Sequence, residues 1–250
     1  MAGRGPKAWS APRVVAHRGG GSLAPENTLG AFRLGASMGF RGVEFDVMLA
    51  GDGTPVLIHD ETLSRTTNGK GDVAATSYAD LAKLDAGAWK GERWRGERIP
   101  TFAEAGRLCR ELGLWANVEI KPAKGHERAT GAAVARMAAE IWRDDPDSCL
   151  LSSFQVAALE AAREAAPHLS RGAIVRPVSD GLEWLPRLGC VSLHCKHQVL
   201  EEAQVRQVRD AGYALLCWTV NEPEVARRLL DWGVDGVITD ALDSIGPDFR

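Results

Sequence analysis

Two acidic side chains alternate inside an apolar stretch of the sequence. Residues 41–47 read RGVEFDV and carry Glu44 and Asp46. Successive side chains of a β-strand point to opposite faces, so both carboxylates lie on one face. Like charges at that distance repel, and burying each is costly unless a positive group meets it. The pattern therefore predicts a cationic partner, either a nearby Arg or Lys side chain or a bound metal ion.

A third acid follows the same rule in LWANVEIK, residues 114–121. Its apolar positions alternate with polar ones, so the polar set should share the interior face: Asn117, Glu119 and Lys121. Glu44, Asp46 and Glu119 would then stand at similar depth. Three carboxylates suit a hard divalent cation, and we expect Mg²⁺, with Ca²⁺ as the alternative.

Two histidines follow apolar runs that resemble strands. His17 ends VVAH and is followed by Arg18 and a glycine-rich turn, while His59 ends PVLIH. An unperturbed imidazole has a pKa near ~6.5, so two such rings can share the roles of general acid and general base. The N–H groups of the glycine-rich turn are expected to be open to a phosphate. Together with the acids, these residues predict a hydrolytic site for a phosphate ester.

The elements that must position these residues alternate along the chain. Apolar runs alternate with helical patterns, such as Val134 to Ile141 and Val225 to Trp232 after an Asn221 to Glu224 capping box. This rhythm over 250 residues predicts an α/β TIM (β/α)8 barrel forming a single domain, 1–250, with a doubly wound open sheet as the alternative. The eight expected strands are 13–17, 41–47, 114–120, 148–152, 169–175, 189–194, 213–219 and 234–239.

One segment interrupts the rhythm. Residues 60 to about 98 occupy a place where a barrel normally has a short connection. The segment contains a polar turn, TTNGKG, and a short helical pattern, SYADLAKLDAG. We expect a small insertion after the second strand region that shapes the site, with a surface excursion as the alternative.

Composition narrows the class of partner. The chain has 30 basic and 33 acidic residues and a net charge of −3, so no broad positive field favours nucleic acid or a stable association with anionic membranes. The five scattered cysteines suit reduced thiols, and residues 1–13 lack the apolar core of a secretory signal. We expect a cytoplasmic protein that acts on a small molecule, and the pattern leaves its oligomeric state open.

Several motifs in order resemble those of glycerophosphodiester phosphodiesterases. They are VVAHRGGGSLAPENTLGAF, GVEFDVMLAGDGTPVLIHDETLSRTTNGKG, IPTFAEA, NVEIKP, CWTVNEP and GVDGVITD, and the likeness runs from about residue 13 to 247. The order of HRG, E-x-D, HD and E-x-K is specific in combination. It resembles the cytosolic bacterial enzyme more than the periplasmic one.

The resemblance implies a metal-dependent hydrolysis of glycerophosphodiesters to glycerol 3-phosphate and an alcohol. It implies a TIM barrel with the segment after His59 as the insertion. It also implies the role of each site residue: His17 and His59 as general acid and base, Glu44, Asp46 and Glu119 as metal ligands, Arg18 and Lys121 on the phosphate oxygens, and Trp218 against the glycerol. Trp218 is also compatible with a purely structural role, because its strand is nearly all apolar.

Two local sequences differ from the family pattern or could suggest another metal site. Many relatives have an Arg after the final Thr-Asp, whereas this chain has Ala241, so a contact from that Arg is not expected. The stretch CVSLHCKHQV contains Cys190, His194, Cys195 and His197, but its spacing fits no zinc template and alternation separates His194 from Cys195. His194, at a strand end, is expected to line the mouth.

Other functions also fit the residues. A related barrel phosphodiesterase acting on phosphoinositides or sphingolipids would use the same groups. A barrel that binds sugar phosphates without catalysis is a candidate from a different class. The nucleophile, either water or the glycerol hydroxyl through a cyclic phosphate, is not set by the residues.

Overall fold

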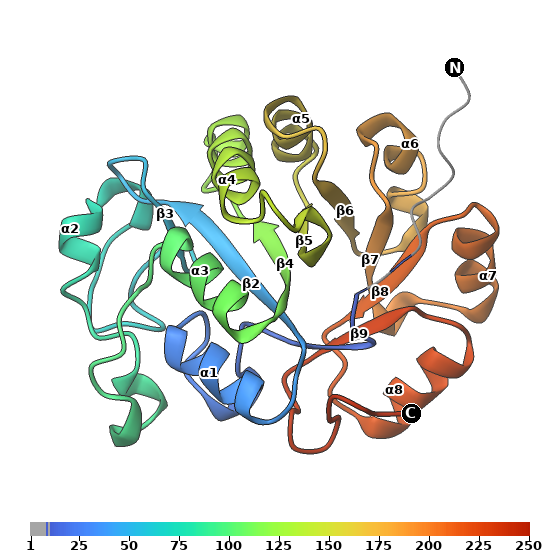
Figure 1. Ribbon diagram of the computed structural model, residues 1–250, viewed down its shortest axis with the longest axis horizontal. Helices are drawn as coiled ribbons and strands as arrows, with labels where there is room; N and C mark the ends of the chain where they lie inside the picture. Colours follow the sequence, from blue (N-terminus) through green and yellow to red (C-terminus); the bar gives the residue numbers. More distant parts are fainter. Residues whose placement is uncertain (1–8, 10) are drawn as a thin grey trace.

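The computed structural model describes residue 9 and residues 11–250, and in this part of the chain eight parallel strands close into a barrel (Figure 1). β1 pairs with both β9 and β2, which closes the sheet and excludes the open, doubly wound alternative. The fold is a TIM (β/α)8 barrel. Its strands are β1 Val14–Ala16, β2 Gly42–Leu49, β4 Trp115–Ile120, β5 Cys149–Ser153, β6 Ser170–Val175, β7 Ser192–Lys196, β8 Ala214–Trp218 and β9 Gly236–Thr239.

Helices surround the barrel (Figure 1). They are α1 Leu29–Ser37, α3 Phe102–Leu112, α4 Glu127–Ile141, α5 Val156–Ala165, α6 Trp184–Leu188, α7 Glu202–Asp210 and α8 Pro223–Asp231. The apolar positions of β2 face this layer, where Phe45 contacts both Phe32 of α1 and Phe102 of α3. The outward face of β2 is thus packed, and its acids are left on the inner face, as the alternation predicts.

A second apolar cluster fills the amino end of the barrel interior. It is formed by side chains of β1, β4, β5, β8 and β9: Val15, Trp115, Leu150, Leu216 and Ile238. Further along β4 the same face carries Asn117 and then Glu119. The interior is therefore a packed core that becomes polar toward the carboxyl ends of the strands, where TIM barrels carry their active sites.

The insertion stands on one side of the barrel (Figure 1). It is preceded by β3, Pro55–Leu57, an antiparallel partner of β2 that was not among the eight expected strands. The short helix expected in SYADLAKLDAG is α2, Tyr78–Leu81. The segment has its own apolar cluster, which includes Ile58, Leu63 and Leu81.

Two boundary predictions are wrong. β7 begins at Ser192 and not at 189, because Gly189 ends α6 in a left-handed conformation at φ 62°. No capping box joins Asn221 to Glu224, since the N-cap position of α8 is Glu222, whose side chain makes no capping hydrogen bond. The Asn221 side chain instead accepts the backbone N–H of Asp240, which ties α8 to the end of β9.

Among the described residues, none of the helices has the length and apolar character needed to cross a bilayer. The expectation about a leader rests on residues 1–13, most of which lie outside the described part of the chain.

The α3 cap gives a test of how the insertion joins the barrel. Thr101 accepts the backbone N–H of Glu104, and Glu104 accepts that of Thr101. Thr101→Ala should lower the free energy of unfolding by about 1 kcal/mol in urea titrations. Thr101→Ser, which keeps the hydroxyl, should lose much less, and equal losses would contradict this capping role.

Candidate active site

The proposed site residues meet in a cavity at the carboxyl end of the barrel. Its volume is about 120 Å³, and its lining includes His17, Arg18, Glu44, His59, Glu119, Lys121 and Trp218. An open groove of about 490 Å³ adjoins it and shares His59, Glu119, Lys121 and Phe154 as lining residues. We call these spaces the inner cavity and the outer groove.

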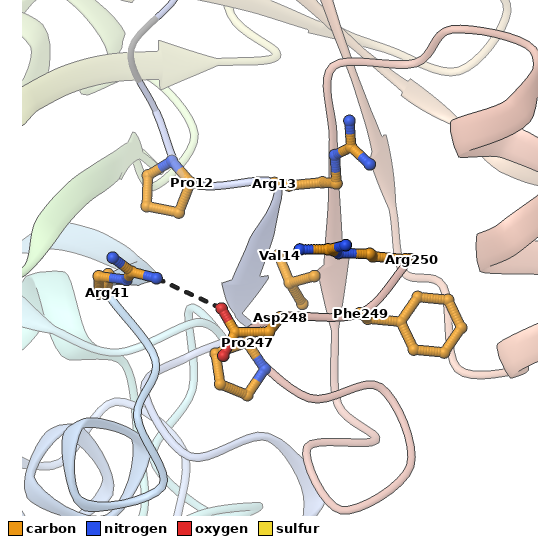
Figure 2. Close-up of a pocket in the computed structure, with 8 residues that line it drawn as sticks. All are labelled: Pro12, Arg13, Val14, Arg41, Pro247, Asp248, Phe249 and Arg250. Carbon is orange, nitrogen blue, oxygen red and sulfur yellow. Dashed lines mark hydrogen bonds and ion pairs between the residues drawn. The ribbon is translucent and has the colours of Figure 1, made fainter.

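A larger hollow of about 680 Å³ lies at the opposite end of the barrel (Figure 2). It is formed where β1 begins, at Arg41 just before β2, and at residues 247–250. Arg41 and Asp248 pair across it at 3.3 Å, and both are mostly exposed. Because the acids and imidazoles lie at the other end, this hollow is not the candidate site.

The three acids converge as the strand faces predict. Glu44 and Asp46 come from β2 and Glu119 from β4, and Asp46 and Glu119 are paired neighbours in the sheet. One carboxylate oxygen from each lies within 4.8 Å of the others, and no other described residues form such a group of three or more acids, histidines or cysteines. Buried carboxylates at this spacing form the donor set that a hard divalent cation prefers.

The charges of these acids are not fully balanced. Burial, followed by the charge of Asp46, raises the pKa of Glu44 to about 8 and also raises the pKa of Glu119. Burial would raise the pKa of Asp46 as well, but Arg18 and then Lys121 outweigh it and lower that pKa. The repulsion therefore falls mainly on Glu44 and Glu119, and a cation among the three oxygens would relieve it.

Arg18 and Lys121 approach the acids but are shared with other groups. The Arg18 guanidinium lies 3.3 Å from Asp46 and 2.8 Å from Glu26. The Lys121 ammonium lies 3.1 Å from Glu119 and 3.8 Å from Asp46. In the described structure these two permanent cations pair with three carboxylates, and neither forms an ion pair with Glu44. The alternative in which basic side chains neutralise every acid therefore does not account for the site.

Unusual backbone conformations hold the acids in place. Arg18 and Asn27 are the described non-glycine residues with positive φ, at 49° and 60°. Arg18 thereby donates its backbone N–H to Glu44 at 3.1 Å. Asn27 makes two hydrogen bonds to Asp46: its amide NH₂ donates to the Asp46 carboxylate, and its Oδ1 accepts the backbone N–H of Asp46. Strain of this kind persists where the surroundings fix a functional geometry.

The glycine-rich turn uses some of its N–H groups within the fold. The N–H of Arg18 is used by Glu44, that of Gly21 by the His17 carbonyl, and that of Ser22 by the Asp240 carbonyl. No partner is found among the described residues for the N–H groups of Gly19 and Gly20, so these two remain candidates for a phosphate.

His17 is oriented by a carboxylate at the far end of the chain. Its Nδ1–H donates to Asp240 at 2.6 Å, and its Nε2 lies 3.7 Å from Glu44. Burial lowers the pKa of His17, but the Asp240 hydrogen bond and the charge of Glu44 outweigh it, so the pKa is raised. Sequence reasoning did not find Asp240, and its signal is an acid directly after the last strand.

His59 has a similar partner. Its Nδ1–H donates to Asp60 at 2.6 Å, and Asp60 in turn accepts two N–H groups of Arg65. Arg65 also donates to Glu26, and Glu26 accepts a second hydrogen bond from Arg18. Burial lowers the pKa of His59, and Arg18 and Lys121 add to this against the opposing charge of Asp46. The insertion is thereby connected to the barrel mouth by a chain of charged side chains.

Aromatic side chains form the opposite wall. Trp218 lines the inner cavity, packs edge-on against Phe154 at 5.5 Å between ring centroids, and donates its indole N–H to the His194 carbonyl. His194 lines the same cavity, as expected. Cys195 points instead into the helix-side core, so strand alternation does separate the two and they do not form a zinc site.

Carboxylates, imidazoles and cations at the carboxyl end of a closed (β/α)8 barrel define an enzyme of the TIM-barrel class. The chain belongs to the Glycerophosphoryl diester phosphodiesterase family, whose sequence model matches residues 17–244. This agrees with the resemblance in the motifs.

Known proteins resemble the chain over most of its length. It is 36% identical to a glycerophosphodiester phosphodiesterase of Caldanaerobacter subterraneus, covering 93% of this chain and 95% of that one. It is 34% identical to a putative glycerophosphodiester phosphodiesterase of Bacillus subtilis, with 94% and 97% covered. An Oleispira antarctica phosphodiesterase, solved with the product sn-glycerol-3-phosphate, superposes with a TM-score of 0.89 at 41% identity, with 92% and 94% covered.

The acid cluster predicts opposite effects on stability with and without a metal ion. In a chelator at pH 9, above the raised pKa of Glu44, Glu44→Gln should raise the unfolding temperature by about 2 to 4 °C, because one of three repelling charges is removed. Mg²⁺ should stabilise the parent protein and have little effect on the variant, as thermal unfolding would show. Glu92→Gln, an exposed change in the insertion, is the control. A less stable variant that still responds to Mg²⁺ would contradict this interpretation.

Proposed function

We propose that the chain hydrolyses glycerophosphodiesters, such as deacylated phospholipid head groups, to glycerol 3-phosphate and an alcohol. The observation that carries the proposal is a group of three carboxylates within 4.8 Å of one another beside a cavity that two carboxylate-bound imidazoles line. The family match and the product bound to the Oleispira enzyme support it.

Glu44, Asp46 and Glu119 are the proposed ligands of a divalent cation, Mg²⁺ in preference to Ca²⁺. Such an ion acts as a Lewis acid toward a phosphoryl oxygen. Arg18 and Lys121 are proposed to bind the other phosphate oxygens, since both line the inner cavity and carry donors beside the acids. A phosphodiester gains negative charge as it is attacked, so these cations stabilise the transition state more than the ground state.

The two imidazoles are proposed to move the protons. Asp240 and Asp60 hold the Nδ1 atoms, which leaves each Nε2 for the substrate. His59 borders both the inner cavity and the outer groove, while His17 borders the inner cavity. We place the glycerol phosphate inside, against Trp218, and the departing alcohol in the outer groove. His59 then protonates the alcohol, and His17 accepts the proton of the nucleophile. Without the cation the pKa of His17 is the raised one and that of His59 the lowered one, and a cation at Glu44 would offset the charge that raises the pKa of His17.

The proposal also places this activity in a single domain and in the cytoplasm. Residues 1–250 act as one domain, because the insertion is joined to α1 and the barrel mouth through Glu97 to Gly30 and Arg65 to Glu26. The five cysteines are free and buried, which supports a reducing compartment and hence the cytoplasm. The substrate is a small diester.

Turnover of glycerophosphocholine tests the function directly. Glycerol 3-phosphate should appear in ³¹P NMR spectra and choline in ¹H NMR spectra when Mg²⁺ is present, and neither should appear in a chelator. Binding without turnover on any head group would favour a sugar-phosphate-binding barrel. Activity confined to intact phosphoinositides or sphingolipids would favour the related phosphodiesterases. A transient cyclic glycerophosphate would identify the glycerol hydroxyl as the nucleophile.

The proton roles predict different responses to the leaving group. His17→Ala and His59→Ala should each lower kcat on glycerophosphocholine by about 10²- to 10⁴-fold. With glycerophospho-p-nitrophenol, whose leaving group needs no proton, His59→Ala should recover most of its loss and His17→Ala should not.

Exposed His168→Ala serves as the control and should retain the parent rate. Recovery in the His17 variant alone would reverse the two roles. Full turnover in both active-site variants would refute the acid and base assignment.

A further inference from the structure

Two residues that line the inner cavity carry buried polar atoms without a partner. The Asn117 Nδ2 and His194 Nδ1 atoms make no hydrogen bond within the described part of the chain. Both residues are almost fully buried, at 1% and 0% exposure. Buried polar atoms are nearly always paired in native proteins, so two unpaired atoms on one cavity indicate a ligand that supplies the missing partners.

The local structure holds the His194 ring in place. Ser192, two residues earlier on β7, forms a hydrogen bond of 2.9 Å with its Nε2. Gly172 on the adjacent strand β6 leaves room for this pair, since a Cβ there would lie 2.7 Å from both Nε2 and the Ser192 hydroxyl. The ring is fixed by Ser192 while its other nitrogen stays unpaired.

This wall of the cavity carries no charge. Burial lowers the pKa of His194 to about 3, so the ring is neutral at physiological pH. Ile174, its partner in the sheet, and Trp218, which donates to its carbonyl, line the cavity beside it, whereas Asn117 lies next to the acids as the sheet partner of Glu44. A neutral group that both donates and accepts hydrogen bonds suits this wall better than an ion.

We propose that His194 and Asn117 bind the hydroxyl groups of the glycerol moiety and so select glycerol diesters over diesters of alcohols that lack the terminal hydroxyl. A hydroxyl accepts from the Asn117 amide, and it pairs with His194 Nδ1 whichever tautomer the Ser192 bond sets. The inference rests on the proposed function and assigns the specificity of the same site. Both are specificity residues with no part in proton transfer.

A substrate pair isolates this interaction. Glycerophosphocholine and propane-1,2-diol 1-phosphocholine differ only in the terminal hydroxyl. The parent protein should favour the first by about 10- to 100-fold in kcat/KM, because the second leaves buried polar atoms unpaired. His194→Leu should bring the ratio to within about threefold of unity.

Three further variants separate recognition from folding. His194→Asn keeps a polar atom near Nδ1 and should retain part of the preference. Gly172→Ala should weaken the preference with His194 intact, because the new Cβ displaces the ring. His168→Leu, at an exposed position, is the matched control. Circular dichroism checks that each variant is folded.

The outcomes distinguish this inference from the function on which it rests. An unchanged ratio in folded His194→Leu or Gly172→Ala, or an equal fall on both substrates, would overturn the hydroxyl assignment alone. If the parent protein hydrolysed neither ester, both the proposed function and the hydroxyl assignment would be refuted.

Discussion

The mutual repulsion of three buried acids is the constraint on which the site depends. Glu44, Asp46 and Glu119 approach within 4.8 Å at the mouth of the barrel, and Glu44 and Asp46 are buried. Such an arrangement persists only if positive charge is brought to it. The shared positions of Arg18 and Lys121 and the strained backbone at Arg18 follow from that need. The same need makes the site suited to an anionic ester bound through a cation.

The two faces of β2 have different roles in meeting this constraint. The outer face of β2 is packed under the helices, and this fixes the acids on the inner face. His59 directly precedes the insertion, which contributes Asp60 and Arg65, and Arg65 pairs with Glu26 beside Arg18. A change in the insertion can therefore reach the acids through one continuous set of ion pairs.

The sequence alone predicted the parts of this arrangement that depend on local periodicity. Alternation in RGVEFDV and LWANVEIK placed the acids on one face, and the rhythm of apolar runs identified all eight barrel strands. The partners of the two histidines were harder to find. His17 and Asp240 are 223 positions apart, and only closure of the barrel brings them together. The start of β7 was missed because Gly189 was read as part of the strand and is the C-cap of α6. The capping box of α8 failed because Asn221 bonds to Asp240, a tertiary contact that a local pattern does not show.

Locating a bound metal ion tests the central claim most directly. Mn²⁺ can replace Mg²⁺ at oxygen sites and is visible by anomalous diffraction from crystals soaked in the metal. We expect one strong Mn²⁺ peak at the barrel mouth, coordinated by oxygens of Glu44, Asp46 and Glu119. Mn²⁺ bound elsewhere, or a mouth in which Arg18 and Lys121 neutralise the acids and leave no room for the ion at saturating Mn²⁺, would contradict the account.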